Sequence, residues 1–284
     1  MKWAGLTGIL AGLFALAPPA RAQDLRSFTA SRQLGGDDEI AVRVTYGAGR
    51  FLVGSAPAGL LYRMQLRYDE DLFEPVAAYD RGMMRLGVEG LGRHVRVGKQ
   101  EGGELRVDLA RDVPMRLVLD FGAGRASLDL GGLSLTDLQL HTGAAEATMD
   151  VSRPNPVGME RAELEVGAAD FTARRLGNLN ARRIEVNAGV GDINIDLTGE
   201  WRRDGVVHVA IGLGALELRF PEGVGVKLIE QTFLTSVDTQ GLVKRGDAYY
   251  SLDWDRAARH ITVDIQAAFG SINIRWSPNG REGR

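Results

Sequence analysis

The stretch Asn187-Ala-Gly-Val-Gly-Asp-Ile-Asn-Ile-Asp-Leu197 contains the end of one expected strand, a corner with two glycines and the start of a second strand. Apolar and polar residues alternate on both sides of the corner, and the apolar members are Ile184, Val186, Ala188, Ile193, Ile195 and Leu197. This period of two is typical of strands that bury one face and expose the other. We expect Gly189 and Gly191 to bend the chain by adopting positive φ angles.

The same pattern recurs at a nearly constant spacing. With the first corner residue as the origin, copies lie at Gly47, Gly122, Gly143, Gly167, Gly189 and Gly212, and a further copy has Ala268 in the glycine slot. The origins from 122 to 212 are separated by 21, 24, 22 and 23 residues. Such a period is typical of stacked-repeat folds. The sequence therefore predicts an all-β, single-domain β-solenoid, a β-helix-like stack of two-strand rungs of about 22 residues.

The chain divides into four expected sections. Residues 1–22 have the features of a signal peptide, because Lys2 precedes an apolar run and Ala20-Arg21-Ala22 fits a cleavage site. Residues 23–113 are strand-rich but irregular, which predicts an N-terminal β cap. The repeats occupy residues 114–276, with 261–276 as the last rung, and residues 277–284 form a disordered tail. We therefore expect an exported protein, periplasmic or extracellular, with no stable membrane anchor after cleavage.

Charge and cysteine content restrict the partners. Loss of Lys2 and Arg21 with the leader reduces the 34 basic side chains to 32, against 37 acidic ones, so the mature net charge is about −5. This balance argues against nucleic acid as a partner and against electrostatic attachment to an anionic membrane. The chain has no cysteine, so the apolar core must stabilise it without disulfides.

Charged residues recur at one place in the repeat. Seven residues after each corner stand Asp129, Asp150, Arg174, Asp196, Arg219 and Arg275. We expect the members Asp150, Arg174, Asp196 and Arg219 to form an outward ladder of alternating charge. Opposite charges on neighbouring strands contribute roughly 0.2–1 kcal/mol per pair.

No motif predicts a catalytic residue, a cofactor site or a metal site. Asp192, Asn194 and Asp196 resemble the opening of a calcium loop, but Leu197 and Arg203 replace its glycine and closing glutamate, so they read as the polar face of a strand. The corner glycines match no dinucleotide or phosphate motif. His94, His141, His208 and His260 lack the spacing of a metal site, and no serine has a nucleophile-elbow signature.

A family resemblance follows from the segments Gly189 to Ile195, Tyr249-Tyr250, Ala258 to Ile265 and Phe269 to Ile274. The sequence resembles the bacterial toast-rack family over most of residues 40–276. That family includes predicted adhesins and the C-terminal domains of LiaF-like proteins of the cell-wall-active antibiotics response. The resemblance implies a module of the cell envelope, linked to envelope stress. LiaF-like proteins carry membrane helices ahead of this domain and this chain shows only a leader, so a membrane-embedded sensor is not implied.

The sequence therefore predicts an exported, non-enzymatic, adhesin-like module that binds an envelope protein or glycan. Two alternatives stay open. One is a polysaccharide-cleaving β-helix enzyme, in which Asp129, Asp150 and Asp196 act as acid or base beside Arg174. The other is a periplasmic lipid or lipoprotein carrier that accepts an acyl chain between its sheets. Bulky apolar residues at almost every inward site favour a packed interior over such a gap.

Overall fold

The computed structural model describes residues 25–92, 103–168 and 170–277. Two predictions fall outside this part of the chain: the signal peptide at 1–22 and the tail beyond residue 277. His94 also lies outside the described residues. Ser277 itself pairs with Pro221 as the last residue of a strand, so the boundary of the predicted tail was one residue too early.

Almost all regular structure in the described residues is strand. The strands are β1 (Leu25–Gln33), β2 (Ile40–Ser55), β3 (Leu60–Asp69), β4 (Phe73–Asp80), β5 (Met83–Gly90), β6 (Glu104–Leu109), β7 (Met115–Asp129), β8 (Leu135–Asp150), β9 (Met159–Ala168), β10 (Asp170–Arg174), β11 (Ala181–Asp196), β12 (Gly205–Pro221), β13 (Gly225–Thr232), β14 (Thr235–Val237), β15 (Leu242–Arg245), β16 (Ala248–Ser251) and β17 (His260–Ser277). A short 3₁₀ helix, η1, spans Leu176–Leu179. The all-β prediction is confirmed.

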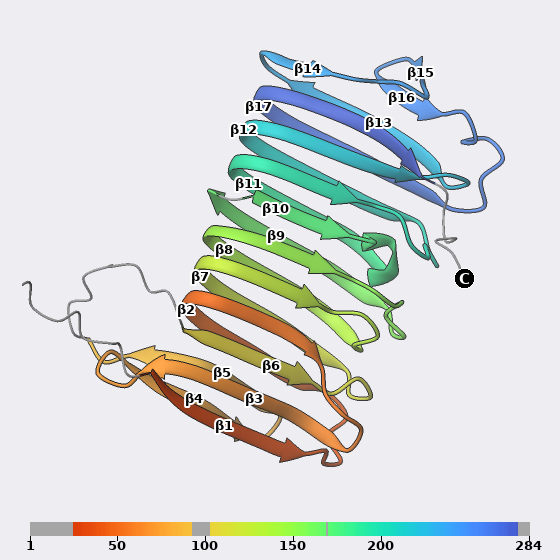
Figure 1. Cartoon of the computed structure of the whole chain (residues 1–284). Coiled ribbons are helices and arrows are strands. Elements are labelled where there is room, and N and C mark those ends of the chain that lie inside the picture. Colours follow the sequence, from red (N-terminus) through yellow and green to blue (C-terminus); the bar gives the residue numbers. More distant parts are fainter. Residues whose placement is uncertain (1–24, 93–102, 169, 278–284) are drawn as a thin grey trace, which may run out of the picture.

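Each long strand contains one complete rung, because it runs along one side of the stack, bends at its corner and returns along the other side (Figure 1). Strands β9 and β10 together form one such rung. Neighbouring rungs pair in parallel and in register: Ile193 lies beside Leu216, and Leu216 lies beside Ile272. From β7 to β12, the spacing of about 22 residues seen in the sequence is the length of chain that returns to the same place one rung later, whereas β13 to β16 intervene in sequence between β12 and β17.

The two sides of the stack have different strand orders. Before the corners the order is β4-β5-β2-β7-β8-β9-β11-β12-β17-β13-β16-β15, and after the corners it is β1-β3-β6-β2-β7-β8-β10-β11-β12-β17-β14. The prediction that 261–276 forms the last rung is wrong, because β17 lies between β12 and β13. Both halves of β17, before and after its corner, pair with a strand on each side. The strand β14 has only three residues and ends the order after the corners.

The core lies between the two sides of the stack. The inward residues that the alternation predicts are buried throughout, and Ile195, Leu218 and Ile274 are 1%, 0% and 3% exposed. Burying a side chain of this size contributes roughly 1.5–3 kcal/mol. Because these residues repeat in register, the interior is a continuous column of apolar side chains rather than a gap for an acyl chain.

Buried asparagines hold the loops that close the side opposite the corners. The Asn155 side-chain amide donates to the carbonyls of Leu135 and Leu179 at 2.8 and 2.9 Å. Asn178 donates to the carbonyl of Val151 at 2.8 Å and accepts from the backbone N–H of Glu200 at 2.8 Å. These side chains bond backbone N–H and C=O groups of the loops that have no partner in the parallel sheets. Each such group, if buried without a hydrogen bond, would lower stability by about 1–3 kcal/mol.

Candidate binding surface

The corners lie along one edge of the stack, and their two glycine slots have different physical roles (Figure 1). At the second slot the backbone has positive φ, 145° at Gly191 and 142° at Gly214. At the first slot, a Cβ on Gly189 would come within 2.9 Å of the carbonyl oxygen of Gly167 in the neighbouring rung. The expectation of positive φ is therefore confirmed for Gly191 and wrong for Gly189. There, close approach of two backbones favours glycine, and β17 alone among the repeats carries alanine, Ala268, in this slot.

Large apolar side chains protrude from the C-terminal corners. They form a row that we call the corner ridge: Val190, Leu213, Phe269, Phe233 and Leu234, which are 49%, 50%, 46%, 65% and 71% exposed. The ridge is continuous, because Leu213 lies in register with both Val190 and Phe269. The corresponding residues of the earlier corners are all small: Ala48, Ala123, Ala144 and Ala168. Exposed apolar patches of this kind mark interaction sites on soluble proteins.

Two features hold the C-terminal end of the ridge in place. The rings of Phe233 and Phe269 meet edge to face, with centroids 5.9 Å apart. Leu234 has φ of 49°, in the left-handed region that costs a residue with a Cβ roughly 1–2 kcal/mol. Strain of this type concentrates at functional sites.

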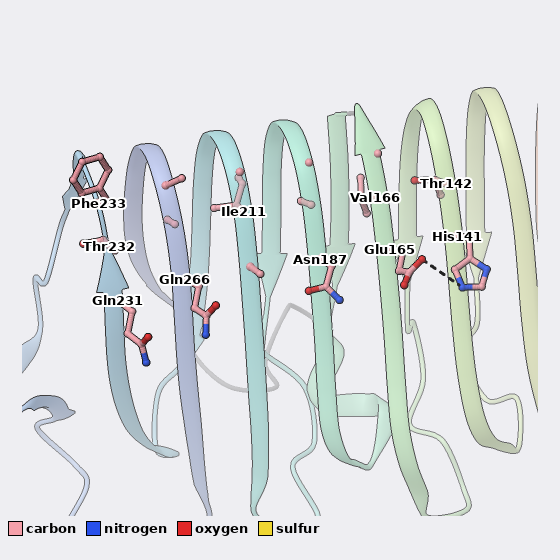
Figure 2. Close-up of a pocket in the computed structure, with 17 residues that line it drawn as sticks. His141, Thr142, Glu165, Val166, Asn187, Ile211, Gln231, Thr232, Phe233 and Gln266 are labelled. Carbon is pink, nitrogen blue, oxygen red and sulfur yellow. Dashed lines mark ion pairs between the residues drawn. The ribbon is translucent and has the colours of Figure 1, made fainter.

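An open groove of about 970 Å³ runs beside the ridge. Figure 2 shows its lining residues on neighbouring strands. The lining forms three rows: an outward row of His141, Glu165, Asn187, Ala210, Gln266 and Gln231; an inward row of Thr142, Val166, Ala188, Ile211, Ala267 and Thr232; and a corner row of Gly167, Gly189, Gly212, Ala268 and Phe233. The groove meets the ridge at Phe233. Glycines along the corner row keep the groove shallow and open.

A chain of charged groups ends in the groove at its N-terminal end. Arg43 donates to Asp120 at 2.6 Å, and His141 Nδ1 lies 2.8 Å from the other oxygen of the same carboxylate. His141 Nε2 lies 3.8 Å from a Glu165 oxygen, which is the contact drawn in Figure 2. Register explains the cluster, because Asp120, His141 and Glu165 occupy the same place on three successive strands. Asp120 thereby fixes the orientation of the imidazole.

The predicted ladder residues do align, but they do not pair with one another. Asp150 lies in register with Arg174, and Asp196 with Arg219. Among the ion pairs of the described residues, however, none joins two members of the column, and Asp150 pairs with Arg175 instead. The ladder prediction is therefore right about the shared face and wrong about the contacts.

Two of the three carboxylates in the enzyme alternative, Asp129 and Asp196, form hydrogen bonds with the chain next to them. Asp129 accepts from the Ser152 hydroxyl at 2.7 Å and from the Gly131 backbone N–H at 2.9 Å. Asp196 accepts from the Thr198 backbone N–H at 2.8 Å. Both hydrogen bonds to backbone N–H groups hold the turn that follows a strand. This role accounts for the recurrence of acidic residues at the ends of these rungs.

The calcium-like residues form the polar face of β11, as predicted. Asp192, Asn194 and Asp196 alternate with buried Ile193 and Ile195. Elsewhere, His208 lies 3.5 Å from Asp264, and His260 Nε2 lies 3.0 Å from the carbonyl of Trp254. Within the part of the chain that the structure describes, no three His, Cys, Asp or Glu side chains converge as a metal site requires.

Sequence reasoning missed both the ridge and the groove. A signal for the ridge was present, because the residue between the two glycine slots changes from alanine to Val190, Leu213 and Phe269 along the chain. The groove had no comparable signal. Its lining comes from six strands and becomes a surface only after stacking.

Comparison with known proteins gives a family and distant structural neighbours. The family model for the N-terminal domain of toast_rack matches residues 21–174 and again residues 159–219. No curated protein matches the chain. Over the described residues, no helix is long and apolar enough to cross a bilayer.

Three solved structures with a similar fold share 17% identity or less with this chain. A candidate cell adhesion protein from Clostridium sporogenes has 17% identity and a TM-score of 0.49, with 89% of this chain and 100% of that chain covered. A candidate adhesin from Bacteroides fragilis has 11% identity and a TM-score of 0.38, with 88% and 97% covered. A candidate lipid-binding protein from Parabacteroides distasonis has 9% identity and a TM-score of 0.23, with 90% and 97% covered. The family match, which spans residues 21–219, shows that the chain belongs to the toast-rack family.

Proposed function

We propose that this protein is an exported, non-enzymatic, adhesin-like module of the bacterial envelope, which binds an envelope protein or glycan through the corner ridge and the adjoining groove. The observation that carries the proposal is the row of exposed apolar side chains, with Leu213 50% exposed and Phe233 65% exposed. A folded protein gains little from such side chains in water, whereas a bound partner would remove their apolar surface from solvent.

Further observations support the parts of this proposal. The β-solenoid architecture is supported by the parallel register of successive rungs, in which Ile195 lies beside Leu218 and Leu218 beside Ile274. A non-enzymatic role is supported by the structural hydrogen bonds of Asp129 and Asp196. Export is supported by the signal-peptide features of residues 1–22. Membership of the toast-rack family supports the envelope setting.

Photo-crosslinking in living cells tests the binding surface. A photoreactive amino acid at Leu213 should capture a specific envelope component, because this side chain lies in the middle of the ridge. The matched control carries the same amino acid at Arg174, which is exposed on the outer face after the corners, away from the ridge. Capture at both sites to the same extent, or at neither, contradicts the proposal.

Export and the absence of enzyme activity need separate tests. Mass spectrometry of the mature protein should find Gln23 or a near neighbour at the N-terminus, and retention of Met1 would contradict export.

Incubation of the mature chain with a panel of bacterial and plant polysaccharides should give no product. Release of oligosaccharides that disappears on replacing Asp150 by Asn would instead support the enzyme alternative.

A further inference from the structure

The dimensions of the groove suit an extended chain better than a single small molecule. Its lining comes from β8, β9, β11, β12, β17 and the end of β13, which are consecutive neighbours in the stack. Neighbouring strands lie about 4.8 Å apart, so five intervals give a length of about 24 Å. A chain that crosses the strands at right angles would meet equivalent groups at every step.

Three members of the outward row, beyond His141 and Glu165, carry neutral amide side chains. Asn187, Gln266 and Gln231 each carry an amide that can both donate and accept, which matches hydroxyl groups that do the same. The lining contains one carboxylate, Glu165, and no lysine or arginine. His141 is the one basic side chain of this lining, and the carboxylates of Asp120 and Glu165 flank its ring, so a polyanionic ligand is disfavoured. The chemistry therefore favours a neutral, hydroxyl-rich ligand.

A buried hydroxyl in the groove wall lacks a partner. Thr142 is 7% exposed, and its Oγ1 makes no hydrogen bond within the described part of the chain. An unpaired buried hydroxyl costs about 1–3 kcal/mol, which a ligand hydroxyl at the groove would relieve. The neighbouring distance of 3.8 Å between His141 Nε2 and a Glu165 oxygen is too long for a direct hydrogen bond, so this ring nitrogen can bond a ligand hydroxyl.

The backbone of the groove is not available to a peptide. Peptides commonly bind sheets by adding a strand to an open edge. The groove instead crosses interior strands, whose backbone groups already pair on both sides; β12, for example, pairs with β11 and with β17 along nearly its whole length. Recognition there depends on side chains alone, which removes the main source of affinity for an extended peptide.

From these observations we infer that the groove binds a neutral glycan chain that lies across the rungs from His141 to Phe233. This inference rests on the proposed function and specifies its ligand. The amides and Thr142 hydrogen-bond the sugar hydroxyls, and the exposed face of Phe233 packs against the C–H groups of a sugar ring. The corner ridge beside the groove covers the apolar side of the chain.

Titration of the mature protein with neutral hexasaccharides tests this inference. The probes are cellohexaose, chitohexaose, maltohexaose and xylohexaose, with oligogalacturonate as an anionic comparison, and the readouts are calorimetry and NMR. At least one neutral probe should bind and the anionic one should not. Thr142→Val should weaken binding about five- to tenfold, the loss expected for one hydrogen bond, while the unfolding midpoint stays at or above that of the wild type. Phe233→Ala should weaken binding to a similar extent, and Arg174→Ala should leave it unchanged.

The possible outcomes separate this inference from the broader proposal. The glycan assignment is wrong if no neutral hexasaccharide binds. It is also wrong if the affinity for the hexasaccharide is the same in Thr142→Val, Phe233→Ala and the wild type. Capture of a protein by the crosslinker at Leu213, without glycan binding, would overturn the glycan assignment and leave the envelope-binding role intact. Absence of both crosslinking and glycan binding would overturn both.

Discussion

Replacing Gly212 by alanine tests whether the approach of neighbouring rungs selects glycine at the first corner slot. The added Cβ would lie 2.6 Å from the carbonyl oxygen of Gly189, whereas ordinary van der Waals contact begins at 3.4 Å. The two rungs would have to separate locally by 3.4 − 2.6 = 0.8 Å. Overpacking of this kind costs about 1–3 kcal/mol. Because Ala268 occupies the same slot in β17, we expect a folded variant whose free energy of unfolding falls by that amount.

Gly47 provides the matched control. It occupies the same slot in β2, yet a Cβ there would meet nothing within 4 Å, and its φ is not in the left-handed region. Gly47→Ala should therefore be neutral or stabilise the protein by about 0.4–1 kcal/mol, since alanine restricts the unfolded chain.

Urea unfolding followed by circular dichroism measures both variants, and amide hydrogen exchange shows whether protection is lost at β11 and β12. Stacked repeats can unfold in steps, so midpoints and exchange rates are compared rather than one extrapolated free energy. The reasoning predicts opposite signs for the two variants. Equal midpoints, or a Gly212→Ala variant as stable as the wild type, would show that rung spacing does not select glycine at this slot.

Three further predictions concern the loops, the ridge and a buried phenol. Asn178→Ala should lower the free energy of unfolding by about 2–3 kcal/mol, because two backbone groups lose their partner, and calorimetry against the surface variant Asn273→Ala checks this. Leu213→Ser should change stability by no more than about 0.5 kcal/mol but reduce binding of a hydrophobic dye; an unchanged dye signal would count against an accessible ridge. Burial raises the pKa of Tyr46, so the unfolded state releases this proton first, and stability falls by up to about 1.4 kcal/mol per pH unit above pH 10. Tyr46→Phe should make that slope shallower in alkaline unfolding curves, and an identical slope would contradict the assignment.

The sequence by itself determined which residues form the core. Alternation around Gly189 places Ile184, Val186, Ile193 and Ile195 inside, and the structure buries all four. The reason is local, because the side chains of a strand point alternately to opposite faces whatever the strand pairs with. The repeat spacing likewise followed from the order of residues along the chain. Each rung needs the same apolar sites and the same small residue at its corner, so these residues recur at a regular interval. The resemblance to the toast-rack family also came from the sequence, although most of its segments lie beyond residues 21–219, which the family model matches.

Only the tertiary structure decided how the rungs are ordered and what their surfaces offer. The sequence of β17 does not indicate that this strand lies between β12 and β13. Its alternation of apolar and polar residues fits an end rung as well as an interior one. The partners of Asp150 and the groove between Thr142 and Phe233 depend on which residues of other rungs lie alongside. The period-two pattern specifies the inward face of each strand, whereas the outward surface depends on which rungs lie side by side, and these can be as distant in sequence as Leu213 and Phe269.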